Sequence, residues 1–293
     1  MGIIAISRGS YTRGKDIAER VARRLGYRCI SREILLEASK DCNIPEIKLL
    51  HAIQDAPSIL DRITRDKEKY IIFFRSALYN RIKEDNVVYH GFAFHFFVKD
   101  IPHVLRVRIN ADLEDRLGIV MERDNVSRKE ALRSIENVDL QRKKWGRRLY
   151  GIDVSESMLY DLVLNATRFP QEDIVDLICR AARLKHFQTT PASKRAMEDL
   201  ALAAQVETLL FNIKPRAEIC IENGFVSLRT EAQVNQNSPL VNSMEKIMKM
   251  IPAVKGIKVV TAGHPDDRAV CIGDPAGASV RGVDRTFFTE LGG

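Results

Sequence analysis

The first 26 residues constrain the fold most strongly, because they combine a short apolar run, a polar loop and an amphipathic segment. Residues 2–6 are apolar and suit a short buried strand. A polar loop follows over residues 7–14, and apolar residues then recur at helical spacing until Gly26, a residue type that often ends a helix. Strand, loop and helix in this order open a βαβ unit, which predicts a parallel sheet covered by helices.

The loop between this strand and helix matches the pattern G-x-x-x-x-G-K, since residues 9–16 read GSYTRGKD. In this pattern, backbone N–H groups and a helix N-terminus surround phosphate oxygens, and the lysine reaches the outer phosphates. Asp16 stands where a serine or threonine usually binds Mg²⁺, and its carboxylate could also reach a metal but would repel phosphate. The alternative is an ordinary turn with a solvated lysine. The expected phosphate-site residues are Gly9, Ser10, Thr12, Arg13, Gly14, Lys15 and Asp16.

Short apolar strands alternate with helices as far as residue 187. The strands are expected near residues 27–30, 87–89, 104–109 and 161–165, with helical periodicity between them. We therefore predict an α/β fold over residues 1–187, with a P-loop parallel sheet, helices on both faces and a helical lid. His90 ends one predicted strand and could face a ligand there, although a structural histidine is the alternative.

The sequence changes character after residue 187. Residues 188–193 are a candidate linker, and residues 194–262 follow an αββαβ pattern in which Asn223-Gly224 predicts a two-residue hairpin. We predict a second, small α+β domain over residues 194–262. The tail over residues 263–293 is rich in Gly, Pro and Asp and is expected to be loosely ordered.

The basic excess of the chain lies in its first part. The net charge is +7, and residues 1–190 hold 34 Lys and Arg against 27 Asp and Glu, whereas residues 191–293 hold 12 of each. This distribution favours an anionic partner of the first part, namely a nucleotide, a nucleic acid or a membrane surface. A solvated basic surface would explain the same count.

Cysteine and histidine spacing narrows the chemistry further. The five cysteines are scattered without a C-x-x-C pair, which favours reduced thiols and a cytoplasmic location over a disulfide scaffold or a zinc site. The six histidines show no metal-ligand spacing, so we expect no protein metal cluster. No apolar run reaches the roughly 18 residues of a membrane helix, and the start lacks a signal-peptide pattern.

Several short motifs, kept in order over about residues 1–185, resemble the cytidylate kinase-like family. They include Ile6-Ser7-Arg8, Leu25-Gly26, Arg32-Glu33-Ile34, residues 102–107 and residues 160–165. The resemblance implies a nucleoside monophosphate kinase that uses ATP and Mg²⁺, with a cytidylate-like acceptor. It also implies that nucleotides, rather than nucleic acid, are the partners, and that Arg32 holds the acceptor phosphate. Arg8 could sit over the phosphates, or it could form a structural salt bridge.

Residues 142–148 place five cations on one predicted helix, after Asp139. Arginine and lysine side chains stabilise the charge that develops in phosphoryl transfer. The family resemblance implies that this helix is the lid and that Arg142 and Lys144 act there, followed by Arg147. A solvated helix face, or a nucleic-acid patch with Trp145 for stacking, are the alternatives.

Three departures from the family pattern favour a second hypothesis. Tyr11 and Arg13 replace glycines of the loop, Ser31 replaces an aspartate, and Phe92 replaces an arginine that usually helps to hold phosphate. These changes weaken the expectation of catalysis more than that of nucleotide binding. The alternative function is a catalytically impaired nucleotide sensor.

Residues 195–262 resemble a BON domain, through residues 217–221, Asn223-Gly224-Phe225-Val226-Ser227-Leu228 and residues 254–260. This resemblance implies contact with a protein or with phospholipid, and a regulatory or dimerising role. In the sensor hypothesis, this domain would transmit the nucleotide state.

Overall fold

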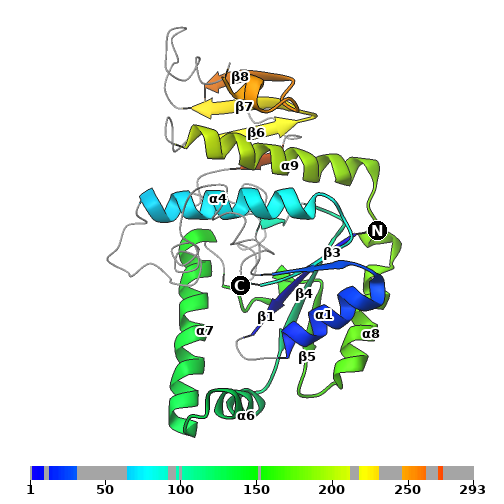
Figure 1. Ribbon diagram of the computed structural model, residues 1–293, viewed down its shortest axis with the longest axis vertical. Coiled ribbons are helices and arrows are strands. Elements are labelled where there is room, and N and C mark those ends of the chain that lie inside the picture. Colours follow the sequence, from blue (N-terminus) through cyan, green and yellow to red (C-terminus); the bar gives the residue numbers. More distant parts are fainter. Residues whose placement is uncertain are drawn as a thin grey trace, which may run out of the picture.

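The computed structural model describes most of the two predicted units (Figure 1). The described residues are 2–9, 13–31, 65–91, 97–98, 101–150, 153–211, 218–230, 246–261 and 270–272.

The first unit is built on a five-stranded parallel sheet, as the sequence predicts. Its order is β2-β3-β1-β4-β5, so β1 lies at the centre between β3 and β4. The strands are β1 (Ile3–Arg8), β2 (Arg28–Ile30), β3 (Val87–His90), β4 (Val104–Asn110) and β5 (Leu162–Asn165).

Alternation along β1 divides its side chains between two cores. Ile4 and Ile6 pack on one face against the helix α1 (Gly14–Leu25), which ends at Gly26 with a left-handed φ of 68°. The helix α8 (Gln171–Ala182) covers the same face. Ile3 and Ala5 face the opposite core, which includes α4 (Arg65–Ile82). Helices on both faces are therefore confirmed.

Two further helices lie on the side of the molecule toward which the arrows of β1 and β4 point (Figure 1). They are α6 (Leu113–Asp124) and α7 (Arg128–Tyr150), which contains the predicted basic lid segment. Two short 3₁₀ helices, η1 (Ser157–Leu159) and η2 (Lys185–Phe187), flank β5 and α8. The basic segment is thus helical and belongs to a helix on this side of the molecule.

The second unit contains one long helix and a four-stranded sheet of order β8-β7-β6-β9. Its elements are α9 (Pro191–Leu210), β6 (Glu218–Glu222), β7 (Phe225–Thr230), β8 (Gly256–Thr261) and β9 (Val270–Ile272). Asn223 and Gly224 both have positive φ, 51° and 83°, and join β6 to β7. The predicted hairpin is confirmed; of the predicted helix between β7 and β8, only residues 246–250 are described, and they are helical.

Three expectations about the second unit need correction. The expected linker 188–193 is partly helical, because Thr190 caps α9 in a capping box with Ser193 and Pro191 occupies the first turn. Residues 270–272 of the expected loose tail form β9, which pairs with β6. Cys220 is disulfide-bonded, so the expectation of reduced thiols is wrong for this residue; Cys271 is its register partner on β9.

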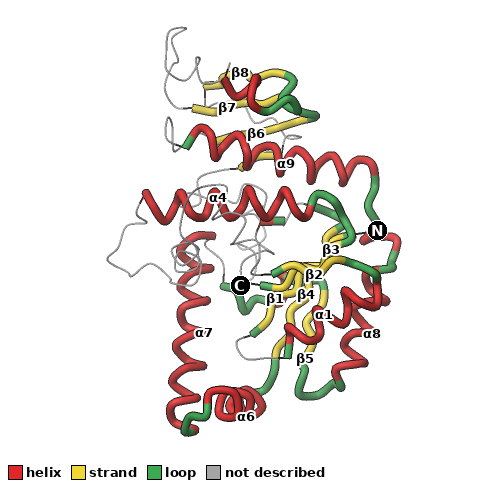
Figure 2. Tube along the Cα trace, viewed as in Figure 1, coloured by secondary structure: helices red, strands yellow, loops and turns green. Residues whose placement is uncertain are grey.

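The two units share a packed interface rather than an open linker. Figure 2 shows α4, α9 and the second sheet stacked in this order above the first sheet, and residues from all of these elements belong to one core cluster. A buried ion pair joins Arg75 of α4 to Glu207 of α9, and Gln205 Nε2 donates to Asn80 Oδ1 at 2.6 Å. The division of the chain at residues 187 and 194 stays a prediction.

Gly2 tests the packing at the start of β1. A Cβ at this position would lie 2.6 Å from the backbone oxygen of Phe187 and 3.2 Å from that of His103. We expect Gly2→Ala to lower the free energy of unfolding by about 1–3 kcal/mol, because backbone atoms must move. Gly118→Ala is the control, because no atom lies within 4 Å and α6 should gain up to about 1 kcal/mol. Urea unfolding measures both, and equal behaviour of the two variants would contradict the packing.

The Arg75–Glu207 pair tests the interface between α4 and α9. Glu207→Leu removes the carboxylate from a buried guanidinium, so we expect a loss of about 3–5 kcal/mol in unfolding free energy. The double variant Arg75→Met with Glu207→Leu removes both charges and should lose less than Glu207→Leu alone. Thermal and urea unfolding of the three proteins give the comparison. A single variant within about 1 kcal/mol of the parent protein would show that the pair is not buried in solution.

Candidate phosphate-binding site

The N-terminus of α1 lies directly after the central strand, at the carboxyl edge of the sheet. The N–H of Gly9 donates to the carbonyl oxygen of Ile109 at 2.9 Å, which fixes the start of the loop to β4. Arg13 occupies the N-cap position, and its side chain makes no capping bond. The first N–H groups of a helix have no partner within the helix, so they can point at an anion together with the positive end of the dipole. Expected contacts of Ser10 and Thr12 lie outside the described residues.

Lys15 and Asp16 both lie in the first turn of α1 and are exposed to solvent. The Nζ of Lys15 lies 3.7 Å from Oε1 of Glu19, one turn further along the helix. An exposed pair of this kind contributes at most about 0.5 kcal/mol, so exchanging Glu19 for a phosphate costs little. Gly14 is buried at the start of the helix.

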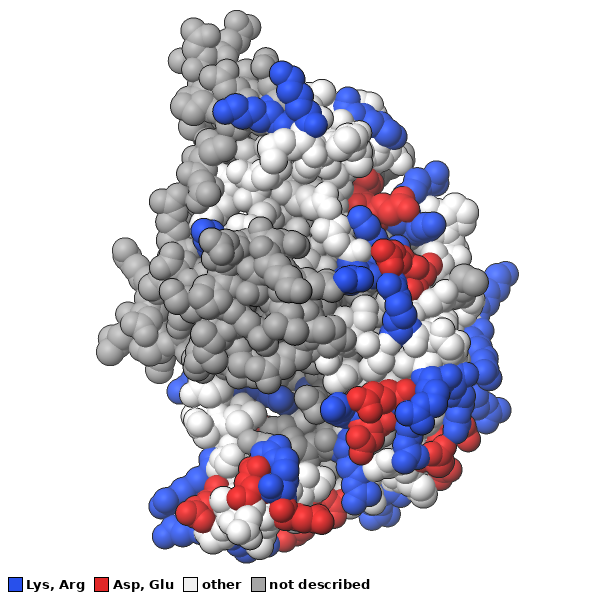
Figure 3. Space-filling model, viewed as in Figure 1, with Lys and Arg blue, Asp and Glu red and all other residues white. Residues whose placement is uncertain are grey.

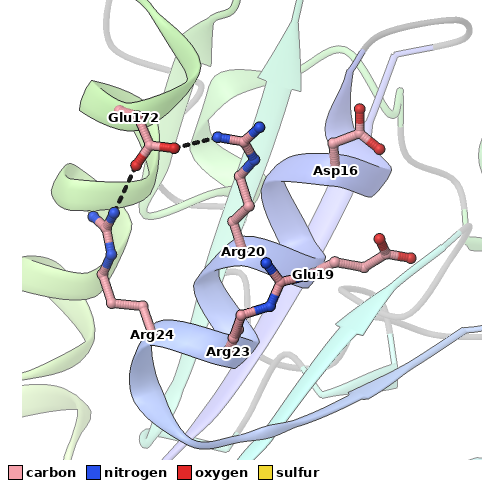
Figure 4. A pocket seen from close by; sticks show the side chains of 6 residues that line it. All are labelled: Asp16, Glu19, Arg20, Arg23, Arg24 and Glu172. Carbon is pink, nitrogen blue, oxygen red and sulfur yellow. Dashed lines mark hydrogen bonds and ion pairs between the residues drawn. The ribbon is translucent and has the colours of Figure 1, made fainter.

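A groove of about 450 Å³ lies between α1 and α8, and of the phosphate-loop residues that the structure describes, Asp16 alone lines it (Figure 4). Three arginines and three carboxylates line it: Asp16, Glu19, Arg20, Arg23, Arg24 and Glu172. Glu172 accepts bonds from Arg20 and from Arg24, the latter at 2.6 Å, and Figure 3 shows cations and carboxylates intermixed on this side. The groove is balanced in charge and exposed, so it explains the attachment of α8 to α1 and not the binding of an anion.

The residues expected on the acceptor side are only partly described. His90 is buried at the carboxyl end of β3 and lies opposite Ile6 in the register. The N–H of Gly91 donates to the carbonyl oxygen of Ile6 at 3.3 Å, and a Cβ at Gly91 would lie 2.4 Å from the hydroxyl of Tyr89. Arg8 ends β1. The side chain of Arg8 and all of Arg32 and Phe92 lie outside the described residues, so their roles stay predictions.

The predicted lid cations lie on α7 in different environments. Arg142 is half-buried, whereas Lys144 and Arg147 are exposed. Asp153 lies 3.0 Å from Nη2 of Arg147 and 3.0 Å from Nζ of Lys143, so this carboxylate holds the C-terminal part of α7. The hydroxyl of Ser155, 2.6 Å from Asp153, outweighs burial and, together with Lys143, lowers the pKa of this carboxyl.

Sequence analysis missed a cluster on the face of the sheet opposite α1. Arg108 of β4 donates from Nη1 to the hydroxyl of Tyr160 at 3.1 Å and to Oγ of Ser7 at 3.4 Å. Its Nε donates to Oδ1 of Asn110 at 3.0 Å. Alternation along β4 could have indicated that two arginines share this face, because Arg106 and Arg108 are two residues apart.

The described part of the chain was also searched for metal-binding clusters and for membrane-spanning helices. It holds no group of three or more His, Cys, Asp and Glu side chains that could ligate a metal. None of its helices is both long and apolar enough to span a bilayer.

A parallel sheet with a loop and a helix N-terminus at its carboxyl edge is the arrangement in which many α/β proteins bind phosphate. The sequence model of the cytidylate kinase-like family matches residues 3–168. The chain therefore belongs to the cytidylate kinase-like family.

Curated relatives agree with this assignment. The chain is 30% identical to the cytidylate kinase of Archaeoglobus fulgidus, over 58% of this chain and 88% of that protein. It is also 30% identical to the cytidylate kinase of Pyrococcus horikoshii, over 33% of this chain and 49% of that protein. The chain thus spans about half the length of the first curated relatives it matches.

Among solved structures, an uncharacterized protein from Eubacterium ventriosum has a TM-score of 0.48 at 22% identity, covering 61% of this chain and 97% of that one. Dephospho-CoA kinase from Campylobacter jejuni has a TM-score of 0.33 at 16% identity, covering 62% of this chain and 97% of that one.

Asp153 gives a prediction that depends on pH. Its lowered pKa means that the carboxylate stabilises the fold above its ordinary pKa of 3.8, and that this stabilisation is lost as pH falls through the folded pKa. We expect Asp153→Asn to cost about 1 kcal/mol at pH 7, because Lys143 and Arg147 are largely exposed, and less at pH 3. Urea unfolding at both pH values is the measurement. The control is Glu122→Gln, at an exposed position near the end of α6, which should change the free energy of unfolding little at either pH. An equal cost of Asp153→Asn at both pH values would contradict the lowered pKa of Asp153.

Proposed function

We propose that this protein is an ATP-dependent kinase that transfers a phosphoryl group to a nucleoside monophosphate. The observation that supports this most is the position of Gly14 and Lys15, which begin α1 directly after the central parallel strand. Backbone N–H groups, a helix dipole and an ammonium group then converge at one edge of the sheet, where a nucleoside triphosphate places its phosphates.

Lys15 would bind the outer phosphates of ATP, with the loop around Gly9 and Gly14 enclosing them. Its contact with Glu19 is weak and exposed, so the ammonium can turn to the nucleotide at little cost. The positive end of α1 adds to the attraction.

Asp16 is the loop residue that suits Mg²⁺. It is exposed in the first turn of α1, and magnesium in kinases is commonly held by one or two carboxylates together with substrate phosphates and water. When bound, the ion neutralises phosphate charge and orients the phosphates for in-line transfer. The positive end of the helix dipole also stabilises the negative charge of Asp16 in the first turn of α1.

Arg142 and Lys144 would approach the transferred group from α7, and Arg8, Arg32 and His90 would hold the acceptor. Phosphoryl transfer needs positioning and electrostatic stabilisation more than a covalent nucleophile. Asp153 engages Lys143 and Arg147, so we give Arg147 a role in anchoring α7. Arg142 and Lys144 are the residues that the family resemblance assigns to the lid, and we propose that they stabilise the charge of the transferred group.

A cytidine monophosphate is the acceptor we propose, because the curated relatives are named cytidylate kinases. The family match ends at residue 168, so α9 and the second sheet lie outside it. We propose residues 194–262 as a separate regulatory domain that acts through the contact of α9 with α4, which Arg75 and Glu207 join.

Lys15→Ala tests the proposal. We expect the rate of ADP formation from ATP and CMP, as kcat/KM, to fall by about 10²–10³-fold, because the variant loses charge stabilisation at the transferred group. Lys129→Ala is the matched control, since this exposed lysine lies in the first turn of α7, and it should retain activity.

The same assay discriminates the alternatives. Saturable ATP binding, together with no ADP formation when AMP, CMP, GMP or UMP is offered as acceptor, would favour a nucleotide sensor. Absence of ATP binding at millimolar concentration would refute both the kinase and the sensor.

A further inference from the structure

We propose that Arg108 binds the phosphate group of the acceptor monophosphate, from the face of the sheet opposite α1. This inference rests on the proposed kinase function and adds a residue that neither the loop pattern nor the lid segment includes. Four observations support it: the partners of the guanidinium, its orientation, its place beside the loop and the face on which it lies.

The guanidinium of Arg108 is bonded only to neutral groups in the described part of the chain. Its three acceptors are the Ser7 hydroxyl, the Tyr160 hydroxyl and the Asn110 side-chain oxygen. Arg106, on the same strand and the same face, instead holds Asp161, with Nη2 2.8 Å from Oδ1 and Nε 3.2 Å from Oδ2. A half-buried cation without a carboxylate has lost part of its hydration without gaining a countercharge, so an anionic ligand is strongly favoured there.

The neutral partners also fix the orientation of Arg108. An arginine has five N–H donors, and these three bonds use Nε and Nη1, so the Nη2 donors take no part in them. The Tyr160 hydroxyl donates to the carbonyl oxygen of Val154 at 2.9 Å and so accepts the bond from Arg108. The Tyr160 ring lies 5.4 Å from the guanidinium carbon, a cation–π distance. The cation is therefore held in place before any ligand binds, which lowers the entropic cost of binding.

Arg108 lies beside the beginning of the phosphate loop. It is the register partner of Ser7, two residues before Gly9, and the next residue, Ile109, accepts the hydrogen bond of the Gly9 N–H. The cluster is thus at the carboxyl edge of β1 and β4, where parallel sheets bind ligands.

The face of the sheet indicates which phosphate Arg108 contacts. Ile6 packs with Ile17 and Ala18 of α1, whereas Ser7 alternates to the opposite face and bonds to Arg108 there. Phosphates held by the N-terminus of α1 therefore approach from one face, and Arg108 approaches from the other. Because the attacking and leaving oxygens are roughly in line across the transferred phosphorus, the group on the Arg108 side belongs to the acceptor.

The test is a binding comparison that separates the phosphate from the rest of the ligand. AMP, CMP, GMP and UMP, the four corresponding nucleosides, and ATP are titrated calorimetrically into the full-length protein and into Arg108→Met. For the monophosphate that the parent protein binds most tightly, we expect its Kd to rise about tenfold or more, since charge-assisted bonds are lost. The Kd values of the matching nucleoside and of ATP should stay within about twofold.

Two further variants are the controls. Arg106→Met removes a cation from the same strand and face that is already paired with Asp161, and it should leave all Kd values within about twofold. Arg108→Lys keeps the charge but not the planar group that Ser7, Tyr160 and Asn110 orient, and it should weaken monophosphate binding by an intermediate factor. Arg108→Lys also keeps the test valid if Arg108→Met fails to fold. In that case, unchanged monophosphate binding by Arg108→Lys would overturn the inference, and so would a loss of monophosphate binding by Arg106→Met.

The outcomes separate this inference from the proposed function. A parent protein that binds ATP and a monophosphate, with Arg108→Met binding the monophosphate equally well, would overturn the role of Arg108 and leave the kinase proposal intact. Equal losses for nucleoside and monophosphate, or for ATP, would also overturn it, because they would indicate a structural effect. A parent protein that binds neither ATP nor any monophosphate would refute both.

Discussion

The pairing of β1 between β3 and β4 is the constraint on which the rest of the structure depends. Six consecutive residues of β1 are in register with β4, and four of them also pair with β3. A parallel strand buried on both faces must be apolar throughout its buried length, and Ile3, Ile4, Ala5 and Ile6 satisfy this. The first polar residue, Ser7, comes where the strand reaches the carboxyl edge, so the loop, α1 and the Arg108 cluster all begin there.

The features that sequence alone could predict are those that depend on residues close together in the chain. An apolar run and a helix that Gly26 ends are local signals, and both were predicted correctly, although β1 continues to Arg8, two residues beyond the predicted strand. The hairpin at Asn223 and Gly224 is also local, since its two positive φ angles depend on these two residue types. By contrast, β9 is only three residues long and exists through pairing with β6, about fifty residues earlier, which no local pattern indicates.

The candidate site was less predictable, because the chemistry of a cation depends on its neighbours rather than its identity. Arg106 and Arg108 look alike in the sequence and share a face, but Asp161 neutralises only the first. Arg147 matched the lid pattern, but it pairs with Asp153, which sequence analysis did not single out. Proximity in space, which β5 and the segment before it bring about, decides which arginines can still attract an anion.

Arg108 and α4 together connect the site to the second unit. The face of the sheet that carries Ser7 and Arg108 is also the face that packs against α4, through Ile3, Ala5 and the apolar side of that helix. The opposite side of α4 holds α9 through Arg75 and Glu207. Packed interfaces shift as units rather than deforming continuously. α9 is therefore connected through α4 to the face that carries Ser7 and Arg108, whereas α1 lies on the other face of the sheet. The regulatory role proposed for the second unit would act first on the acceptor side proposed for that face.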